Sequence, residues 1–267
     1  QVSIFVGVPA VMELLLDGAP LPDLASVRAF ICGGAVLKKE LGERFAAWSR
    51  KPLLDGYGLS ETSPVVSFNR PEKARFGTIG IPIRDVEVAI LDLQGQELPP
   101  GETGEIAVRG PNVMLGYLNQ EKATERAFRY GWFHTEDVGF FDQEGFLHLV
   151  DRLKDLIISS GENIYPREVE QVLLQYPGVA EAAVIGYPDP LRGQSAAAWV
   201  VPEAGTAVDL RALRRYLLDR IAPYKIPKKY FLARELPRTG LGKVRKNVLQ
   251  EETLKLLEKN RTAGRAL

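Results

Sequence analysis

The chain of 267 residues has very little of the two residue types that build most metal and redox centres. It contains one cysteine, Cys32, and two histidines, His134 and His148. A single cysteine excludes an internal disulfide framework and fits a reducing compartment, so we expect a cytoplasmic protein. A zinc or iron cluster is excluded by the same counts, and His134 is not expected to bind a metal.

Net charge and long apolar runs are missing as well. Lysine plus arginine and aspartate plus glutamate both number 34, which gives no electrostatic case for nucleic acid or an acidic membrane surface. No apolar run approaches the roughly 18 residues of a membrane span, so we expect no transmembrane segment. The N-terminus has no signal-peptide pattern, lacks an initiator methionine and starts inside a predicted strand. We therefore expect a fragment of a longer chain.

The first quarter of the sequence alternates strands and helices. Buried strands are predicted at 3–8, 27–32 and 52–55, and the intervening helices begin at Pro9 and at Lys38. The first helix is expected to bury Val11, Leu14 and Leu15. This alternation predicts a parallel sheet, whose ligands sit at the carboxyl ends of its strands. Gly33-Gly34-Ala35 and the segment 56–62 follow the second and third strands, so both are expected to border a site.

The remaining sequence shows two further patterns of apolar and polar residues. Short runs with period-two alternation between residues 77 and 148 predict a small antiparallel barrel or sandwich. After residue 154, strands near 182–185 and 197–201 and helices at 209–221 and 247–258 predict a compact α+β unit, with Asp209 as an N-cap. The predicted fold class is therefore α/β and α+β. The predicted domains are 1–153, made of an α/β layer (1–76) and a barrel-like region (77–153), and a small mobile domain (155–267).

Residues 56–62, Gly-Tyr-Gly-Leu-Ser-Glu-Thr, combine the residue types that a nucleotide site needs. Gly56 and Gly58 allow close approach of the backbone to a ligand. Tyr57 offers a face for a purine, Ser60 a hydroxyl for a phosphate oxygen, and Glu61 a hard oxygen ligand for Mg²⁺. A Gly-Tyr-Gly sequence alone is more often a plain turn at the end of a strand.

Three further stretches are distinctive. Residues 132–137 read Trp-Phe-His-Thr-Glu-Asp, and residues 237–244 read Pro-Arg-Thr-Gly-Leu-Gly-Lys-Val. Residues 151–170 combine a charged linker, a strand at 156–158, a Ser159-Ser160-Gly161 turn and a helix opened by Pro166. With residues 56–62, these stretches resemble in order the motifs of the adenylate-forming enzymes, the acyl-CoA synthetase, luciferase and peptide-synthetase adenylation superfamily. The resemblance covers essentially the whole chain and is greatest to fatty-acyl-CoA ligases.

The resemblance implies a role for each matching residue. Lys243 would bridge the carboxylate and the α-phosphate, Glu61 would act in catalysis as the Mg²⁺ ligand, and Lys154 would be the hinge between two active conformations. Gly161 would border the pantetheine tunnel of coenzyme A. The residues expected to bind the nucleotide or border its site are Gly33, Gly34, Ala35, Asp55, Gly56, Tyr57, Ser60, Asp137 and Arg152.

The sequence departs from the family pattern at four points. Ser60 stands for threonine, Glu136 for the glycine before Asp137, and Ser160 for the first glycine of its turn. The family loop Thr-Ser-Gly-Thr-Thr-Gly-x-Pro-Lys, which holds the phosphates of ATP, does not occur, and neither does Gly-x-x-x-x-Gly-Lys-[Ser/Thr]. We therefore expect this chain by itself to be incomplete and inactive.

The function implied for the parent protein is that of an AMP-forming acid–thiol ligase. It would activate a carboxylic acid, expected to be a fatty acid, with ATP and Mg²⁺, and transfer the acyl group to coenzyme A. Two alternatives stay open: an adenylation domain that loads a carrier protein, and a non-catalytic fragment that binds nucleotide. The acyl group is not identified, and a homodimer is left open.

Overall fold

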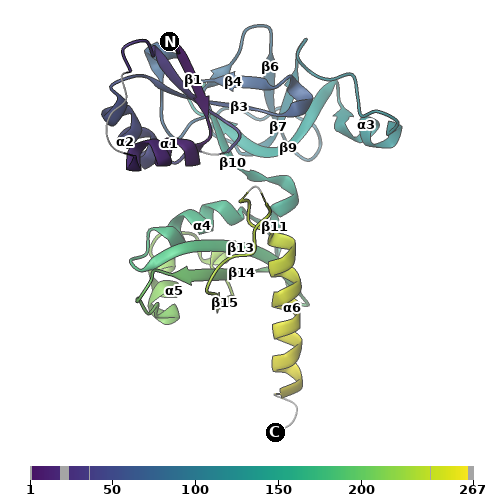
Figure 1. Ribbon diagram of the computed structural model, residues 1–267. Helices are drawn as coiled ribbons and strands as arrows, with labels where there is room; N and C mark the ends of the chain where they lie inside the picture. Colours follow the sequence, from purple (N-terminus) through teal and green to yellow (C-terminus); the bar gives the residue numbers. More distant parts are fainter. Residues whose placement is uncertain (1, 19–23, 36, 241, 264–267) are drawn as a thin grey trace. The chain divides into compact units, whose positions relative to one another are not determined.

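The computed structural model describes residues 2–18, 24–35, 37–240 and 242–263. The chain divides into two compact units, Gln1–Leu149 and Val150–Leu267 (Figure 1). The division falls inside strand β10 (Leu147–Arg152), and Lys154 lies in the 3₁₀ turn Leu153–Asp155 that follows it. A hinge at Lys154 remains a prediction. No helix within the described ranges is long and apolar enough to cross a membrane.

The first sheet of unit 1 is the predicted α/β layer. Its strands, in spatial order, are β1 (Ile4–Gly7), β2 (Ala29–Cys32), β3 (Leu53–Gly58), β4 (Val65–Phe68) and β5 (Ile81–Pro82). The first three are parallel, as predicted, and the last two are antiparallel. Helices α1 (Pro9–Asp17) and α2 (Lys39–Ser49) lie on the same side of these strands (Figure 1). Their contact with the sheet is a core of buried apolar side chains: Met12, Phe30, Cys32, Leu41, Phe45 and Leu53.

Two sequence-based expectations about burial are wrong at this edge. Ile4 and Val6 are 44% and 68% exposed, because they alternate with Phe5, which packs against the core, and therefore point to the opposite face of β1. Leu14 is 71% exposed, and Met12 is the fully buried residue of α1. The helix is apolar around much of its circumference, so periodicity alone did not decide which stripe faces the sheet.

The second sheet of unit 1 is antiparallel and forms the predicted barrel-like region. Its order is β10-β9-β7-β6, from β6 (Glu87–Leu91), β7 (Gly104–Arg109), β9 (Trp132–Phe141) and β10, with β8 (Phe128–Arg129) paired to β9. Helix α3 (Glu121–Ala127) precedes β8. A core that includes Tyr57 and Val66 from the first sheet and Ile106, Phe133 and Leu147 from the second packs the two sheets together.

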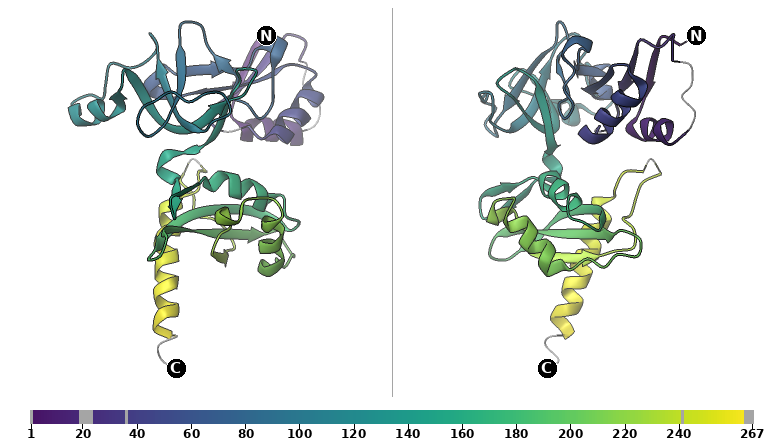
Figure 2. Two further views of the ribbon diagram at one scale, coloured as in Figure 1. Left: turned by 180° about the vertical axis from the view of Figure 1, so that it is seen from behind. Right: turned by 90° about the vertical axis from the view of Figure 1, so that its left-hand side faces the viewer.

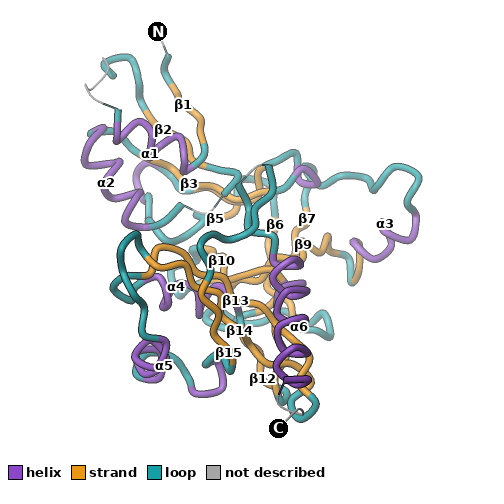
Figure 3. The backbone as a smooth tube through the Cα atoms, turned by 60° about the horizontal axis from the view of Figure 1, so that its bottom comes forward, coloured by secondary structure: helices purple, strands orange, loops and turns teal. Residues whose placement is uncertain are grey.

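Unit 2 is the predicted α+β domain, with longer strands than the sequence indicated (Figure 2, Figure 3). Its sheet has the order β12-β11-β14-β13, and β15 pairs in parallel with β14. The strands are β11 (Ile157–Ser159), β12 (Glu162–Ile164), β13 (Val179–Asp189), β14 (Gly193–Pro202) and β15 (Lys229–Leu232). The helices are α4 (Pro166–Leu174), α5 (Leu210–Leu218) and α6 (Lys246–Ala263).

Both faces of the unit 2 sheet are buried, because alternate residues of a strand point to opposite faces. Ala198 and Val200 of β14 pack with α4 and α5, whereas Trp199 packs on the side of α6. The Trp199 indole Nε1 donates a buried 2.9 Å hydrogen bond to Thr253 Oγ1 of α6. The predicted N-cap of α5 is confirmed, since Asp209 accepts a 2.8 Å bond from the Arg211 N–H.

The predicted Ser159-Ser160-Gly161 turn is the tight end of the β11–β12 hairpin. Ser159 pairs with Glu162, which leaves Ser160 and Gly161 as the two turn residues. Their φ angles are +53° and +85°. Positive φ at both central positions defines the type I′ turn, which matches the twist of a hairpin and prefers Asn-Gly or Gly-Gly.

We expect Ser160→Gly to raise the free energy of unfolding of this chain by about 0.5 kcal/mol. Glycine removes the roughly 1–2 kcal/mol cost of a left-handed side-chain residue, and its extra chain entropy offsets part of the gain. Urea denaturation of residues 1–267 measures the change. As the matched control, Gly161→Ala introduces that cost and should lower stability by about 1 kcal/mol. A Ser160→Gly variant that is clearly less stable would contradict the strain argument.

Candidate functional site

Two of the predicted motifs lie at the same edge of the first sheet. Residues 33–35 follow β2, and the 3₁₀ turn Ser60–Thr62 follows β3, which is the parallel neighbour of β2. Gly33 has open space where a side chain would stand, and Gly34 has φ +76°. The turn at residues 33–35 is therefore open to solvent at the carboxyl end of β2, where ligands of parallel sheets bind.

Gly56 and Gly58 lie inside β3, where a loop was predicted from the sequence. A Cβ on Gly58 would stand 1.6 Å from the Pro64 carbonyl oxygen, and one on Gly56 would stand 2.4 Å from the Phe68 ring. The close backbone approach predicted for these glycines is therefore to the neighbouring segment around β4. A contact of either glycine with a ligand remains a prediction.

Tyr57 and Asp137 are joined across unit 1. The Tyr57 hydroxyl donates a 2.7 Å hydrogen bond to Asp137 Oδ2, between strands of the two sheets and 80 positions apart in the chain. Both are buried, with exposures of 8% and 3%. The Tyr57 ring belongs to the core between the sheets, so its stacking on a purine remains a prediction. The Asp137 N–H donates to Thr135 Oγ1 at 3.1 Å, which further fixes this part of β9.

Glu61 occupies a turn that is held from inside. Thr62 is fully buried, and its hydroxyl accepts a 3.0 Å bond from the Leu59 N–H and donates to the Leu59 and Pro64 carbonyls at 3.0 Å. Glu61 itself is half-buried and Ser60 is exposed. The serine hydroxyl and the glutamate carboxylate are thus presented on a rigid turn.

The segment 112–117 contacts this turn and was missed by the sequence analysis. Asn112 Nδ2 donates to the Thr62 and Val65 carbonyls at 2.9 and 2.7 Å. The Tyr117 hydroxyl donates to Glu61 Oε1 at 3.0 Å. Desolvation raises the pKa of Tyr117, and the bond to Glu61 and the charges of Glu61 and Glu136 raise that pKa further. No local pattern signals these contacts, because they join residues about 50 positions apart.

The donor set around Glu61 fits Mg²⁺ rather than zinc. Within the described ranges there is no group of three or more His, Cys, Asp or Glu side chains that could hold a metal ion. Mg²⁺ is commonly held by one or two carboxylates together with substrate phosphates, and one half-buried glutamate on a rigid turn matches that requirement.

Asp55 is buried, and its Oδ1 accepts a 3.0 Å bond from the Gly56 N–H. Burial and the charge of Asp55 raise the pKa of Cys32 to about 12.

Glu136 adopts the left-handed conformation, with φ +59°. This explains why the resembling family has glycine here, since glycine adopts that conformation without strain. The Glu136 N–H donates to Glu105 Oε1 at 3.1 Å, and Glu105 Oε2 lies 2.7 Å from His134 Nδ1. The other ring nitrogen of His134 lies 3.2 Å from the Arg129 carbonyl oxygen. His134 is thus engaged in a buried structural cluster.

In unit 2, the predicted hinge segment is fixed by Asp151. This buried carboxylate accepts bonds from the N–H groups of Arg152 at 2.8 Å and Arg167 at 2.7 Å. Arg167 is the second residue of α4, so Asp151 caps the helix from a distance, and a negative charge there is favourable. Arg152 and Lys154 are exposed. This capping role was not predicted from the sequence.

Lys243, the predicted catalytic lysine, lies in a loop whose two ends are paired with each other. Arg238 and Val244 form a β-bridge, and the Arg238 guanidinium donates to the Gly242 carbonyl at 2.7 Å and pairs with Glu181 of β13. Lys243 is exposed, and its N–H donates to Thr239 Oγ1 at 3.2 Å. Leu241 of the same motif lies outside the described residues.

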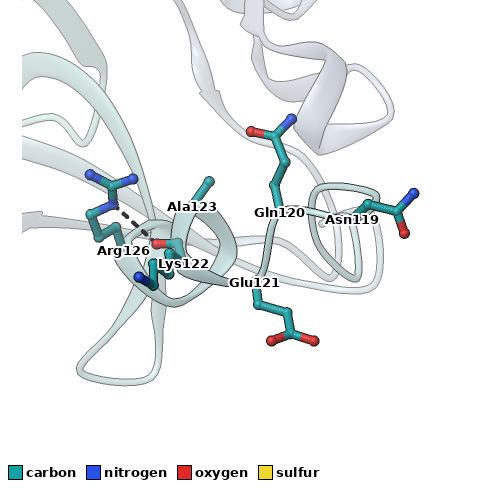
Figure 4. A pocket seen from close by; sticks show the side chains of 6 residues that line it. All are labelled: Asn119, Gln120, Glu121, Lys122, Ala123 and Arg126. Carbon is teal, nitrogen blue, oxygen red and sulfur yellow. Dashed lines mark hydrogen bonds between the residues drawn. The ribbon is translucent and has the colours of Figure 1, made fainter.

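A hollow on unit 1 is separate from these motifs (Figure 4). It is lined by Asn119, Gln120, Glu121, Lys122, Ala123 and Arg126, none of which belongs to the predicted site. The polar side chains in Figure 4 spread apart, and the drawn bond, from Arg126 Nε to the Lys122 carbonyl at 3.0 Å, is internal to α3. The hollow is an open surface feature beside a short helix.

Comparison with known proteins agrees with the resemblance. Residues 1–118 match the model of the AMP-binding enzyme family, and residues 168–243 match the model of the AMP-binding enzyme C-terminal domain. The chain is 43% identical to a feruloyl-CoA synthase of Amycolatopsis sp over 92% of its own length and 51% of that protein. It is 41% identical to a long-chain-fatty-acid–CoA ligase of Bacillus subtilis over 94% of its own length and 46% of that protein.

A solved structure gives the same result for the fold. The o-succinylbenzoate coenzyme A synthetase of Bacillus subtilis, in complex with ATP and a magnesium ion, is 39% identical with a TM-score of 0.80, over 92% of this chain and 51% of that one. The chain spans about half the length of the curated relatives it matches. From its two family models, its relatives and its fold, the chain belongs to the family of AMP-binding, adenylate-forming enzymes.

Proposed function

We propose that this chain contributes half of an ATP-dependent carboxylate–coenzyme A ligase. In the first half-reaction, a carboxylate oxygen attacks the α-phosphorus of ATP, the bond to pyrophosphate breaks, and acyl-AMP forms. In the second, the thiolate of coenzyme A attacks the acyl carbonyl and AMP leaves. The names of the relatives support acid–coenzyme A ligation in general, and the acid is a fatty or aromatic carboxylic acid by analogy with them.

The observation that carries this proposal is the hydrogen bond between Tyr57 and Asp137, which brings two of the resembling motifs into direct contact. Asp137 would accept the ribose hydroxyls and Tyr57 would hold its carboxylate in place while bordering the purine. Arg152 would contact the ribose or the phosphates. The exposed turn at residues 33–35 would border the adenine and the acyl chain.

Ser60 and Glu61 would face the phosphates of ATP. The Ser60 hydroxyl would donate to an α-phosphate oxygen, and Glu61 would hold Mg²⁺. Bound there, the ion would neutralise charge on the phosphates and favour departure of pyrophosphate. Lys243 would add charge stabilisation in the first half-reaction, and Gly161 would leave room for pantetheine in the second. Alternation between the two requires unit 2 to reorient at Lys154.

We expect activity only when the chain is completed by an upstream half. The test is a hybrid enzyme in which residues 1–267 follow the upstream half of the Bacillus subtilis ligase. Pyrophosphate release with a panel of fatty and aromatic acids, and acyl-CoA formation by chromatography, should be measurable for the hybrid and absent for the chain alone. Turnover of the chain alone on the order of 10 per second would contradict this expectation.

The same assay separates the alternatives. The matched control in the hybrid is Asp137→Asn. It keeps the shape of the side chain and removes the charge of the carboxylate that would accept the ribose hydroxyls. A folded hybrid that binds ATP and releases no pyrophosphate with any acid would favour a non-catalytic nucleotide-binding chain. Acyl-AMP that reacts with a carrier protein and not with coenzyme A would favour an adenylation domain.

A further inference from the structure

The turn that carries Glu61 is held by one neighbouring segment, residues 112–117, at three successive points. Asn112 Nδ2 bonds the Thr62 carbonyl at 2.9 Å, the Met114 N–H bonds the Glu61 carbonyl at 2.8 Å, and the Tyr117 hydroxyl bonds Glu61 Oε1 at 3.0 Å. The first two contacts fix the backbone of the turn. The third fixes the side chain, and a half-buried glutamate otherwise samples several rotamers.

We propose that Tyr117 is a positioning residue that orients the Glu61 carboxylate toward a divalent cation. This inference rests on the proposed function, in which Glu61 is the ligand of Mg²⁺. Tyr117 itself would touch neither the cation nor the nucleotide and would act through Glu61.

The two carboxylate oxygens of Glu61 have different surroundings. Oε1 receives the phenol, while Oε2 accepts no hydrogen bond from the part of the chain that the structure describes. A carboxylate can accept about four hydrogen bonds or metal contacts through its two oxygens, so a single phenol leaves Oε2 able to bind a cation. Partners of this kind, which orient a metal ligand from outside, commonly change metal affinity about 10- to 100-fold when removed.

Tyr117 is itself anchored for this task. Its N–H donates to Thr124 Oγ1 at 2.9 Å, and that hydroxyl donates to the Gln120 carbonyl at 3.1 Å. The neighbours Leu115 and Leu118 are 102% and 87% exposed, whereas Tyr117 is half-buried against the acidic turn. The phenol is thus directed inward from an otherwise exposed stretch, by contacts to α3 and to Glu61.

The first test measures order at Glu61 and needs no substrate. In residues 1–267 with ¹³C-labelled glutamate, the Glu61 side chain should populate one rotamer by NMR coupling constants. Tyr117→Phe removes only the hydroxyl and should produce rotamer averaging at Glu61. Tyr130→Phe is the matched control, since Tyr130 is exposed in the same unit and should leave Glu61 unchanged. A Glu61 side chain that stays equally ordered in Tyr117→Phe overturns the positioning role.

The second test measures cation binding in the hybrid enzyme, which includes the upstream half, with Mn²⁺ in the presence of ATP as a paramagnetic probe. Mn²⁺ should broaden the Glu61 signals of the unchanged hybrid, and Tyr117→Phe should weaken the apparent affinity for Mn²⁺ about 10-fold. More Mn²⁺ should restore broadening in Tyr117→Phe, which a merely structural defect would not allow. Equal affinity in Tyr117→Phe overturns the proposal.

Absence of broadening at Glu61 in the unchanged hybrid would also overturn the proposal, because it removes the cation that Tyr117 would serve. Turnover of the hybrid enzyme is measured separately. Failure of this inference is therefore distinguishable from failure of the proposed ligase activity.

Discussion

Lys243→Ala in the hybrid enzyme is expected to slow acyl-AMP formation by roughly 10² or more, because it removes a charge that stabilises the transition state at phosphorus. Conversion of supplied acyl-AMP to acyl-CoA should be unchanged, since phosphorus is no longer attacked in that step. Single-turnover kinetics of each half-reaction measure both effects.

The structure around Lys243 makes this change interpretable. The two ends of its loop are held together by the Arg238–Val244 bridge and by the contacts of Arg238 with Gly242 and Glu181. None of these contacts uses the Lys243 amine. Truncation of the side chain should therefore leave the loop folded. Lys229→Ala is the matched control, because it removes another exposed lysine of unit 2. Equal slowing by both variants would show that general charge, and not the position of Lys243, is responsible.

Gly161→Leu should have the reverse effect on the hybrid. We expect thioester formation to fall by about 100-fold, since a misplacement of reacting groups by a single ångström can cost that much, while acyl-AMP formation is retained. No atom lies within 4 Å of a Cβ built on Gly161, so the leucine meets open space in this chain and obstructs only what binds there.

Backbone strain has to be separated from obstruction, because φ at Gly161 is +85°. Gly205→Leu is the matched control: Gly205 has φ +77° and equally open space in the same unit. Gly161→Ala carries the same strain with little bulk and should be nearly as active as the unchanged hybrid. If Lys243→Ala and Gly161→Leu each slow both half-reactions equally, the two-conformation model fails and Lys154 is an ordinary linker residue.

Much of the fold could be predicted from the sequence. The alternation of strands and helices in residues 3–58, the tight turn at Ser160-Gly161, Pro166 opening α4 and Asp209 capping α5 all follow from backbone chemistry over a few residues. Burial was less predictable. Leu14 and Met12 have similar hydrophobicity and lie two positions apart, and only the docking of α1 decides that Met12 faces the sheet.

The candidate site, like the fold, could be predicted from the sequence only in part. The sequence by itself determined which residues are proposed to carry the chemistry, namely Tyr57, Glu61, Asp137, Gly161 and Lys243, because motif identity and order are properties of the chain. Only the tertiary structure decided their neighbours. It bonds Tyr57 to Asp137 across 80 positions, Tyr117 to Glu61 across 56, and Asp151 to the first turn of α4 across 16. The physical reason is that side-chain hydrogen bonds depend on distance in space, which sheet pairing and core packing set, whereas turns, caps and amphipathic periods depend on residues adjacent in the chain.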